Sequence, residues 1–210
     1  MSNVKVSMSV SLDGFSAGPN QSLESPLGDR GERLHEWVFP LEAFRRAHGS
    51  EGGEVNESTP VVENMSDAGA CVMGRSMFGG GTGPWDESWR GWWGDEPPFN
   101  APVFVLTHHA RDPLPMEGGT TFYFVTDGIE AAVARARDAA GNRDVLISGG
   151  ASVVQQALTA GLVDELTLSI APVLLGGGTR FFAEGASADL EQIAAIEAPG
   201  VVHLRYRVRR

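Results

Sequence analysis

Apolar and small polar residues alternate at the start of the chain. From residue 4 to residue 12 every second side chain is apolar, which is the spacing of a β-strand with one buried face. The strand is expected to stop at Asp13-Gly14, a dipeptide typical of turns, and residues 20–34 are expected to form a loop. The same alternation returns at residues 201–208 and predicts a final antiparallel strand.

Between these segments, short apolar runs alternate with segments of helical spacing. The apolar runs predict strands at residues 70–73, 103–106, 121–125, 144–148 and 166–175. The helical spacing predicts helices at residues 35–47, 61–68, 129–140 and 151–159. Pro40 marks a start or a kink of the first helix. This alternation favours an α/β fold with a mainly parallel sheet, and the strand-rich end of the chain adds antiparallel edge strands.

Length and composition limit the classes of protein to which the chain can belong. Its 210 residues are expected to form one domain, residues 1–210, with a mobile acidic loop at residues 49–59 and a Trp-rich loop at residues 84–99. The net charge of −11 repels phosphate backbones, so nucleic acid is not an expected partner.

The same sequence indicates a cytoplasmic protein. It has no apolar run of membrane-spanning length and no signal-peptide pattern, so no membrane partner is expected. Its one cysteine, Cys71, lies in an apolar run, where a small buried side chain is a better interpretation than a nucleophile. One cysteine also excludes a disulfide framework within the chain, and no metal site is predicted.

Residues 144–158, with the sequence DVLISGGASVVQQAL, carry the strongest local signal. An apolar run ends at Ser148, Gly149 and Gly150 follow, and Ala151 and Ser152 open a helix. Glycines let the backbone approach a ligand closely, and the free N–H groups of a helix start bind an anion such as a pyrophosphate. A glycine pair also makes an ordinary tight connection, so the turn alone leaves both interpretations open.

Two other predicted strand ends carry similar groups. Gly74-Arg75-Ser76 follows the strand at 70–73, and Thr107-His108 follows the strand at 103–106. Ligands of α/β sheets lie beyond the carboxyl ends of the strands, so three such ends can line one site. Backbone donors suit a pyrophosphate, and a cation with hydroxyl groups suits a further ribose phosphate. A surface ion pair for Arg75 and a solvated loop for His108 are the alternatives.

The order of these motifs resembles that of a known superfamily. SVSLDGFSAGP near the start, VMGRSMF in the middle, and DVLISGGASVVQQAL running into VDELTLSIAPVLLGGGTRFF together resemble the dihydrofolate reductase-like superfamily. The resemblance covers residues 4–182 and is strongest to the C-terminal reductase domain of the bifunctional riboflavin-biosynthesis deaminase–reductase and its stand-alone relatives. It implies an α/β fold whose mainly parallel central sheet has about eight strands, an antiparallel C-terminal strand and helices on both faces.

The resemblance also implies NADPH as hydride donor, a homodimer, and a set of cofactor residues. Gly74, Arg75 and Ser76 would open the helix that meets the pyrophosphate and the 2′-phosphate side of the adenosine, with Thr107 and His108 beside that 2′-phosphate. Gly149 and Gly150, in the superfamily often joined by a cis bond, would form the turn against the cofactor. The other residues implied at this turn and at the next helix start are Ser148, Ala151, Ser152 and Val153. The end of the first strand, from Val10 to Gly14, would flank the nicotinamide.

The sequence says less about the substrate. Dihydrofolate reductases use an acid on the first long helix, and here neither Glu36 nor Glu42 registers with it, which argues against folate reduction. Asp13 is the better candidate, because it matches the SLDG motif where the riboflavin-type reductases have an aspartate near the substrate. An Asp-Gly turn residue needs no catalytic role, so that interpretation stays open. Arg45-Arg46 could grip a phosphate, but a solvated helix face is the better interpretation.

Four tryptophans lie in the Trp-rich loop. Trp85 and its neighbours could roof a planar substrate, form a dimer contact, or simply pack an irregular segment. We therefore expect an NADPH-dependent reductase of a small planar heterocycle, pteridine- or pyrimidine-like, with Asp13 as the catalytic residue. Val10, Asp13, Gly14 and Trp85 are the expected substrate contacts. The alternative is a non-catalytic nucleotide-binding or interaction protein on the same fold.

Overall fold

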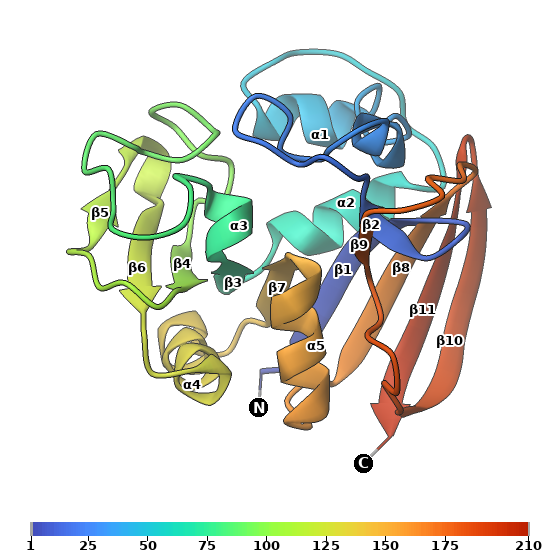
Figure 1. Cartoon of the computed structure of the whole chain (residues 1–210). Helices are drawn as coiled ribbons and strands as arrows, with labels where there is room; N and C mark the ends of the chain where they lie inside the picture. The colour runs from blue at the N-terminus through green and yellow to red at the C-terminus, as the bar shows by residue number, and fades with distance from the viewer. Residues whose placement is uncertain (1, 210) are drawn as a thin grey trace.

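The computed structural model describes residues 2–209 and is built on one large sheet (Figure 1). Its nine strands lie in the order β10-β11-β8-β1-β7-β3-β4-β6-β5. The strands are β1 (Val4–Ser11), β3 (Ala70–Gly74), β4 (Pro102–Leu106), β5 (Leu114–Pro115), β6 (Thr121–Val125), β7 (Val145–Gly149), β8 (Glu165–Ala171), β10 (Asp189–Ala198) and β11 (Val201–Arg209). A separate antiparallel pair joins β2 (Phe15–Ala17) to β9 (Thr179–Arg180).

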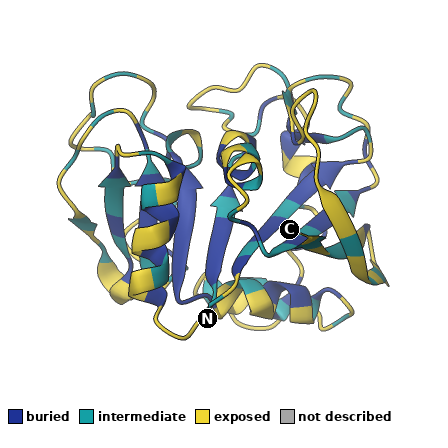
Figure 2. Cartoon of the chain, turned by 90° about the horizontal axis from the view of Figure 1, so that it is seen from below, coloured by how far each residue is buried: buried dark blue, intermediate teal, exposed yellow. Residues whose placement is uncertain are grey.

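Helices cover both faces of the large sheet. They are α1 (Glu42–Ala47), α2 (Thr59–Ser66), α3 (Arg75–Phe78), α4 (Ile129–Ala140) and α5 (Ala151–Thr159), with short 3-10 turns η1 (Gly31–Leu34) and η2 (Glu117–Gly119). α4 and α5 pack with β1, β3 and β7 in the largest hydrophobic cluster. Met65 of α2 and Phe78 of α3 belong to a second cluster on the opposite face. Figure 2 shows the buried strands between helices whose outer sides are exposed.

The strand directions confirm the expected fold class. β8, β1, β7, β3, β4 and β6 are parallel, β11 runs antiparallel to β8, and β10 runs antiparallel to β11. The sheet has nine strands where about eight were expected, because the two-residue strand β5 extends its far edge. Of the helices in residues 2–209, none combines the length and the apolar character needed to span a bilayer.

Two predicted boundaries are wrong for identifiable reasons. The helix expected at 35–47 forms only from Glu42, because Pro40 precedes it and Leu41 makes an isolated bridge with Glu54 instead of a helical turn. The strand expected at 166–175 ends at Ala171, because Pro172 follows and lacks an N–H to donate to a neighbouring strand. The acidic residues 49–59 form a loop up to the start of α2, and the mobility of this loop stays a prediction.

Sequence reasoning missed β10 entirely. Its sequence, DLEQIAAIEA, is rich in helix-forming alanine and glutamate, yet it pairs with β11 along its whole length with one bulge after Gln192. The register puts Leu190 opposite Val208 and Val202 opposite Ile170.

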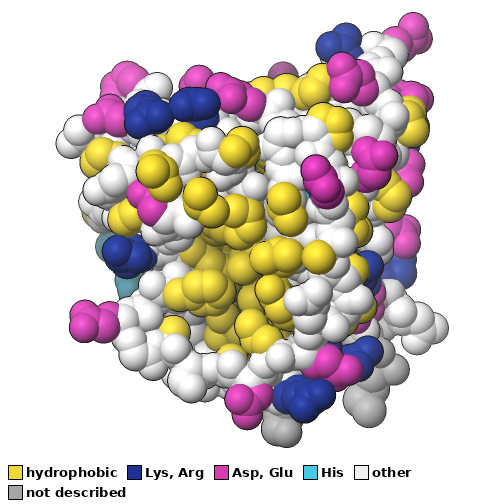
Figure 3. All heavy atoms as spheres, turned by 90° about the vertical axis from the view of Figure 1, so that its right-hand side faces the viewer, with side chains coloured by type: hydrophobic (Ala, Val, Ile, Leu, Met, Phe, Trp, Pro, Cys, Tyr) yellow, Lys and Arg dark blue, Asp and Glu magenta, His cyan; other side chains and the backbone are white. Residues whose placement is uncertain are grey.

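One side of β8, β11 and β10 is an apolar face, defined here by Ile170, Leu190, Val202, Leu204 and Tyr206. These side chains share one side of the sheet by register, and Leu190 and Val202 are each 40% exposed. Figure 3 shows the apolar side chains gathered on the side of the molecule that carries β10 and β11. Exposed apolar side chains that share one side of a sheet are typical of contact surfaces.

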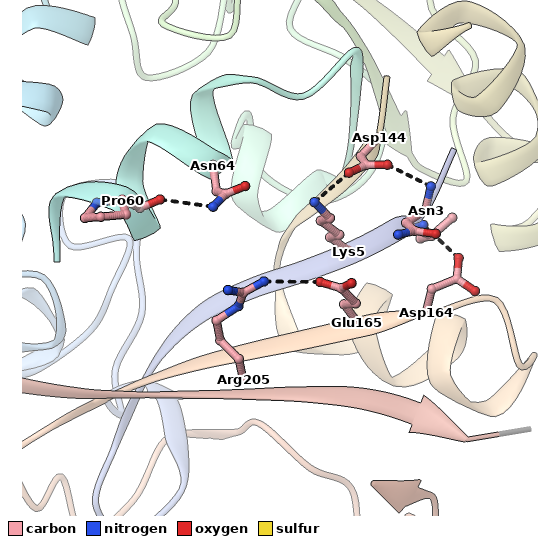
Figure 4. A network of polar contacts seen from close by, with 9 residues as sticks. Asn3, Lys5, Pro60, Asn64, Asp144, Asp164, Glu165 and Arg205 are labelled. Atoms are coloured by element: carbon pink, nitrogen blue, oxygen red, sulfur yellow. Dashed lines mark hydrogen bonds and ion pairs between the residues drawn. The ribbon is translucent and has the colours of Figure 1, made fainter. Parts of the chain in front are cut away.

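Ion pairs hold the amino ends of the parallel strands. Lys5 pairs with Asp144, which also accepts the backbone amide of Asn3 at 2.8 Å, and Arg205 pairs with Glu165 at 3.5 Å (Figure 4). These groups lie where β1, β7 and β8 begin, so they tie the strands together at the end opposite the predicted site. The carboxyl ends of the same strands lead into loops, and ligands of α/β sheets bind at such ends.

Candidate functional site

The turn between β7 and α5 leaves its backbone uncovered. The Gly149-Gly150 peptide bond is cis, as the resemblance implies. Gly149 has a φ of 131°, and a Cβ there would lie 3.1 Å from Sδ of Met8 and 3.2 Å from Sδ of Met77. A Cβ at Gly150 would meet no atom within 4 Å, so open space adjoins that residue. A ligand can therefore approach the Gly150 backbone directly.

The start of α5 follows at once. The first amide that donates within the helix is that of Val153, to the carbonyl of Gly150 at 3.0 Å. The amides of Ala151 and Ser152 thus precede the intrahelical hydrogen bonds. Such N–H groups, beside an uncovered turn, are suited to an anionic ligand.

The end of β3 meets this turn. A Cβ at Gly74 would lie 2.9 Å from Cγ2 of Val153, so the strand end and the helix start are in close contact. α3 begins directly at Arg75, where the resemblance implies a helix start, and Ser76 in its first turn is exposed. Two of the three predicted strand ends therefore lie together.

The third strand end lies on the neighbouring strand. β4 pairs with β3 in parallel register, and Thr107 and His108 follow it. Thr107 is buried, and its hydroxyl accepts the amide of His109 at 3.2 Å, whereas His108 is exposed. The structure brings Thr107 and His108 to the same edge of the sheet as Arg75. Within residues 2–209, neither residue forms a hydrogen bond with Arg75.

Arg75 is a partly buried cation that has no carboxylate partner within residues 2–209. Its guanidinium carbon lies 3.7 Å from the centre of the Trp85 ring, and Nη2 makes one long contact, 3.5 Å, to the carbonyl of Gly80. Nε and Nη1 are buried without a partner. Burial, and then the charge of Arg111, lowers the pKa of Arg75. Unpaired donors on a desolvated cation suit an anion supplied from outside the chain.

Sequence reasoning missed Arg111. Its side chain is 3% exposed and lies 5.4 Å from the Trp85 ring centre and 5.2 Å from that of Phe124. Glu87 pairs with its Nε at 3.3 Å. The surrounding sequence HARDPLP has no motif that points to a ligand, so only the packing identifies this second cation.

Trp85 belongs to the side of the site where these cations lie. Its indole N–H donates to the carbonyl of His109 at 2.8 Å, and its ring packs against Phe78 and Phe124. These contacts place it against α3, β6 and the segment after β4 rather than beside β1, where the other expected substrate contacts lie. Its expected contact with the substrate stays a prediction.

Asp13 lies at the end of β1 and is bound to the chain after β8. Oδ1 accepts the amide of Leu175 at 3.1 Å, and Oδ2 accepts the amide of Gly176 at 2.7 Å. The Ser11 hydroxyl has the largest effect on the pKa of Asp13, and together with the smaller effects of the backbone amides it outweighs desolvation and lowers this pKa from 3.8 to about 2. The carboxylate is therefore ionised at neutral pH and accepts hydrogen bonds rather than donating a proton.

Gly14 and Val10 complete this strand end. Gly14 has a φ of 84°, and its carbonyl accepts the amide of Phe181 at 2.9 Å. Val10 is 3% exposed and packs in the hydrophobic core, so its backbone rather than its side chain is accessible to a ligand.

A hollow of about 200 Å³ lies beside the carboxyl end of β8, two strands from β7. Its lining includes Arg33, Glu36, Trp37, Glu54, Asn56 and Val173. Glu36 pairs with Arg33 there at 3.7 Å.

Glu42 pairs instead with Arg46 at 3.5 Å on an exposed helix face, and Arg45 donates to the carbonyl of Glu51. Neither glutamate has a contact with the turn at Gly150 among the hydrogen bonds and ion pairs of residues 2–209.

A chain of buried polar groups underlies this hollow. His203 is fully buried, with Nε2 2.8 Å from the Ser58 hydroxyl and Nδ1 2.8 Å from that of Ser169. Burial lowers the pKa of His203 from 6.5 to about 4, so the ring is neutral at neutral pH. Trp37 packs edge-on against it at 4.8 Å and donates to the Ser9 hydroxyl at 3.2 Å. This network fixes one wall of the hollow.

Cys71 and Ser148 do not form a reactive site. Burial raises the pKa of the Cys71 thiol to about 11, and the buried hydroxyl of Ser148 has no hydrogen-bond partner within residues 2–209. The thiol is thus protonated and inert. Within residues 2–209 no three side chains of histidine, cysteine, aspartate or glutamate are grouped so as to hold a metal ion.

Comparison with known proteins agrees with the fold. The model of the RibD C-terminal domain family matches residues 2–203, and no curated protein matches the chain by sequence. A Shewanella sp. PV-4 protein, provisionally named for riboflavin biosynthesis, is 24% identical with a TM-score of 0.64, and the match covers 100% of both chains. A pyrimidine reductase-like protein of Corynebacterium diphtheriae is 16% identical with a TM-score of 0.57 over 100% of this chain and 92% of that one. The Enterococcus faecalis dihydrofolate reductase, solved with NADP(H), is 15% identical with a TM-score of 0.55 over 99% and 97%.

Proposed function

The chain belongs to the RibD C-terminal domain family, and we propose on that premise that it is an NADPH-dependent reductase of a small planar heterocycle, pteridine- or pyrimidine-like. The observation that carries the proposal is the pair formed by Arg75 and the turn at Gly150. A desolvated cation with unpartnered donors stands at one strand end, and an uncovered backbone stands at the next. Although the chain has an excess of carboxylates, none pairs with Arg75 within residues 2–209, which supports an anion supplied from outside.

The residues present fit the cofactor. The amides at the start of α5 and the open side of Gly150 would receive the pyrophosphate, and Gly149 and Gly74 keep the two strand ends close enough to share it. Arg75, with Thr107 and His108 on the neighbouring strand end, would hold the 2′-phosphate. When bound, NADPH supplies the hydride, and the protein's part is to orient the acceptor and exclude water.

Asp13 is proposed as the catalytic residue in the form of a carboxylate. Each of its oxygens already accepts one backbone N–H and has capacity for another hydrogen bond. An ionised carboxylate at the end of β1 can orient the amino or amide edge of a pyrimidine-like ring. Because its pKa is about 2, the proton that accompanies hydride transfer comes from water.

A homodimer formed through the apolar face is part of the proposal. Leu190 and Val202 stand 40% exposed on the apolar face, and Glu197, which lies opposite Val202, is a charged side chain on the same side of β10. Two copies that each carry −11 repel one another, and a mainly apolar face reduces that repulsion, which favours this face as the contact. The cytoplasm is the proposed location, since a single buried thiol suits a reducing compartment.

One observation favours the alternative of a nucleotide-binding protein without catalysis. Both oxygens of Asp13 are engaged by the loop after β8, which is also what a purely structural aspartate would do.

A two-stage experiment tests the proposal. The protein is first titrated with NADPH and with NADH while nicotinamide fluorescence is followed, and a panel of pteridines, pyrimidines and quinones is then offered for reduction. We expect binding of NADPH and reduction of at least one ring compound, with Asp13→Asn lowering turnover while NADPH still binds. No binding of either cofactor would overturn the proposal, and binding without any turnover would favour the alternative.

A further inference from the structure

Trp85 of the Trp-rich loop lies against both cations of the cofactor side. Arg75 lies 3.7 Å above its ring, and Arg111 lies 5.4 Å from the same ring centre. Two guanidinium groups this close repel each other, which is why the charge of Arg111 contributes to the lowered pKa of Arg75. The fold holds both cations beside one ring, where the charge of Arg111 also acts on Asp86, and one carboxylate forms an ion pair with them within residues 2–209.

That carboxylate is Glu87, two residues after Trp85. It pairs with Nε of Arg111 at 3.3 Å, and its backbone carbonyl accepts Nη2 of the same side chain at 2.9 Å. Nη1 of Arg111 is buried and has no partner. A guanidinium carries five donors, so this side chain is oriented by the loop and still has donor capacity for a further acceptor.

Glu87 is a weak counter-ion for Arg111. The Glu87 side chain is 78% exposed, whereas that of Arg111 is 3% exposed. Water screens an exposed carboxylate, and a phosphate dianion offers twice the charge and three acceptor oxygens. A phosphate that reaches Arg111 therefore competes favourably with Glu87 for its guanidinium group.

We propose that Arg111 is a second cation for the cofactor's phosphate and that Glu87 is its resident counter-ion, which the phosphate displaces. The inference rests on the proposed function and adds to it a role for the Trp-rich loop. The loop both positions Arg111 and competes for it, so it sets how strongly the protein distinguishes a phosphorylated cofactor from an unphosphorylated one.

Charge-matched variants of the same loop test this. Glu87→Gln removes the competitor, and Asp95→Asn, whose 81% exposed carboxylate pairs with Arg90 at 3.9 Å, removes an equal charge elsewhere in the loop. Both side chains are exposed, so both variants are expected to fold. NADPH, NADH, adenosine 2′,5′-bisphosphate, adenosine 5′-monophosphate and inorganic phosphate serve as probes, with affinity followed by tryptophan fluorescence.

We expect Glu87→Gln to tighten binding of NADPH and of adenosine 2′,5′-bisphosphate about two- to fivefold, the size of an exposed ion pair. NADH, adenosine 5′-monophosphate and the Asp95→Asn variant should show no comparable change. In an Arg111→Lys background, whose single ammonium group cannot keep the same contacts, the effect of Glu87→Gln should shrink.

Three results would overturn the inference: equal effects of Glu87→Gln and Asp95→Asn, equal effects on probes with and without the 2′-phosphate, or an effect unchanged by Arg111→Lys. If neither dinucleotide binds but adenosine 2′,5′-bisphosphate responds to Glu87→Gln, the proposed reductase function fails while the phosphate site stands. If only inorganic phosphate responds, the site is a general anion site and the inference about the cofactor fails.

Discussion

The Asp13 carboxylate accepts the backbone amide of Gly176 at 2.7 Å, across 163 residues of sequence. With the amide of Leu175 on its other oxygen, it fastens the loop after β8 to the end of β1. The same loop continues to β9, which pairs with β2 directly after Asp13-Gly14. One ionised side chain thus closes the edge of the site where the acceptor is proposed to bind.

Asp13→Asn is expected to lower the stability of the protein at neutral pH, because an amide side chain can accept at only one of the two positions. The pKa of Asp13 is lowered from 3.8 to about 2, so its stabilising effect is complete above 3.8 and is lost as the pH falls through about 2. Urea unfolding of the wild type and the variant across this range measures the difference. A difference that persists unchanged at the acid end would contradict the assignment.

The two glycines of the β7–α5 turn should respond oppositely to alanine. Gly149→Ala puts a side chain at a φ of 131° against Met8 and Met77 and is expected to destabilise the fold by about 1–3 kcal/mol. Gly150 has a φ of −77° and open space beside it, so Gly150→Ala should change stability little. Its methyl group stands where the cofactor approaches, and NADPH affinity should fall about tenfold.

Thermal unfolding and NADPH titration of both variants separate these effects. Full NADPH affinity in a well-folded Gly150→Ala would show that the cofactor does not approach this turn.

His203 should make the protein sensitive to mild acid. The unfolded chain takes up a proton below 6.5, whereas the folded state holds the ring neutral down to about 4. Stability therefore falls as the pH decreases across this window, by at most about 3 kcal/mol from this residue. His203→Gln removes the titration, and the stability difference between wild type and variant should shrink toward pH 4. A constant difference across the window would argue against a neutral buried imidazole.

Arg75→Gln should weaken NADPH binding about tenfold to a hundredfold through loss of charge-assisted hydrogen bonds, and leave NADH binding nearly unchanged. Arg46→Gln is the matched control, because Arg46 is 63% exposed and pairs with Glu42 on a helix face of the surface. Fluorescence titrations with both cofactors make the comparison. Parallel losses for NADPH and NADH would mean that Arg75 does not contact the 2′-phosphate.

Val202→Glu should dissociate the proposed homodimer, since it adds a charge to the apolar face beside that of Glu197. Leu23→Glu, at a loop side chain that is 51% exposed and lies outside that face, is the control. Sedimentation velocity of the three proteins reports their mass. A wild type that sediments as a monomer would remove the dimer from the proposal.

Much of the fold follows from local patterns in the sequence. The helices at 129–140 and 151–159 have the predicted bounds, because each buries one regular stripe between the sheet and solvent. β10 was not predictable in this way. Its alanines and glutamates favour a helix, and only pairing with β11 makes it a strand.

The residues of the site also divide into those that local sequence patterns predict and those that they do not. Arg75 and the glycines could be found because strand ends and turns have a sequence signature. His203 could not, since in the alternating segment VVHLRYRV it occupies a position that usually faces water. Trp37 covers that position here, and Ser58 and Ser169 bond the ring. Such burial depends on a segment 166 residues away in sequence, and no local pattern reports it.

β1 lies in the interior of the sheet although it is the first strand of the chain. In the strand register, Val4 lies opposite Val145 of β7 and Lys5 lies opposite Glu165 of β8. Both neighbours of β1 are therefore synthesised long after it. During synthesis the apolar side chains of β1 have no neighbouring strand to pack with until β7 and β8 have left the ribosome. Folding is accordingly dominated by long-range contacts, which makes it slow and exposes an unpaired strand to aggregation in the meantime. The nascent chain therefore has more need of a chaperone than a domain of this size with local topology.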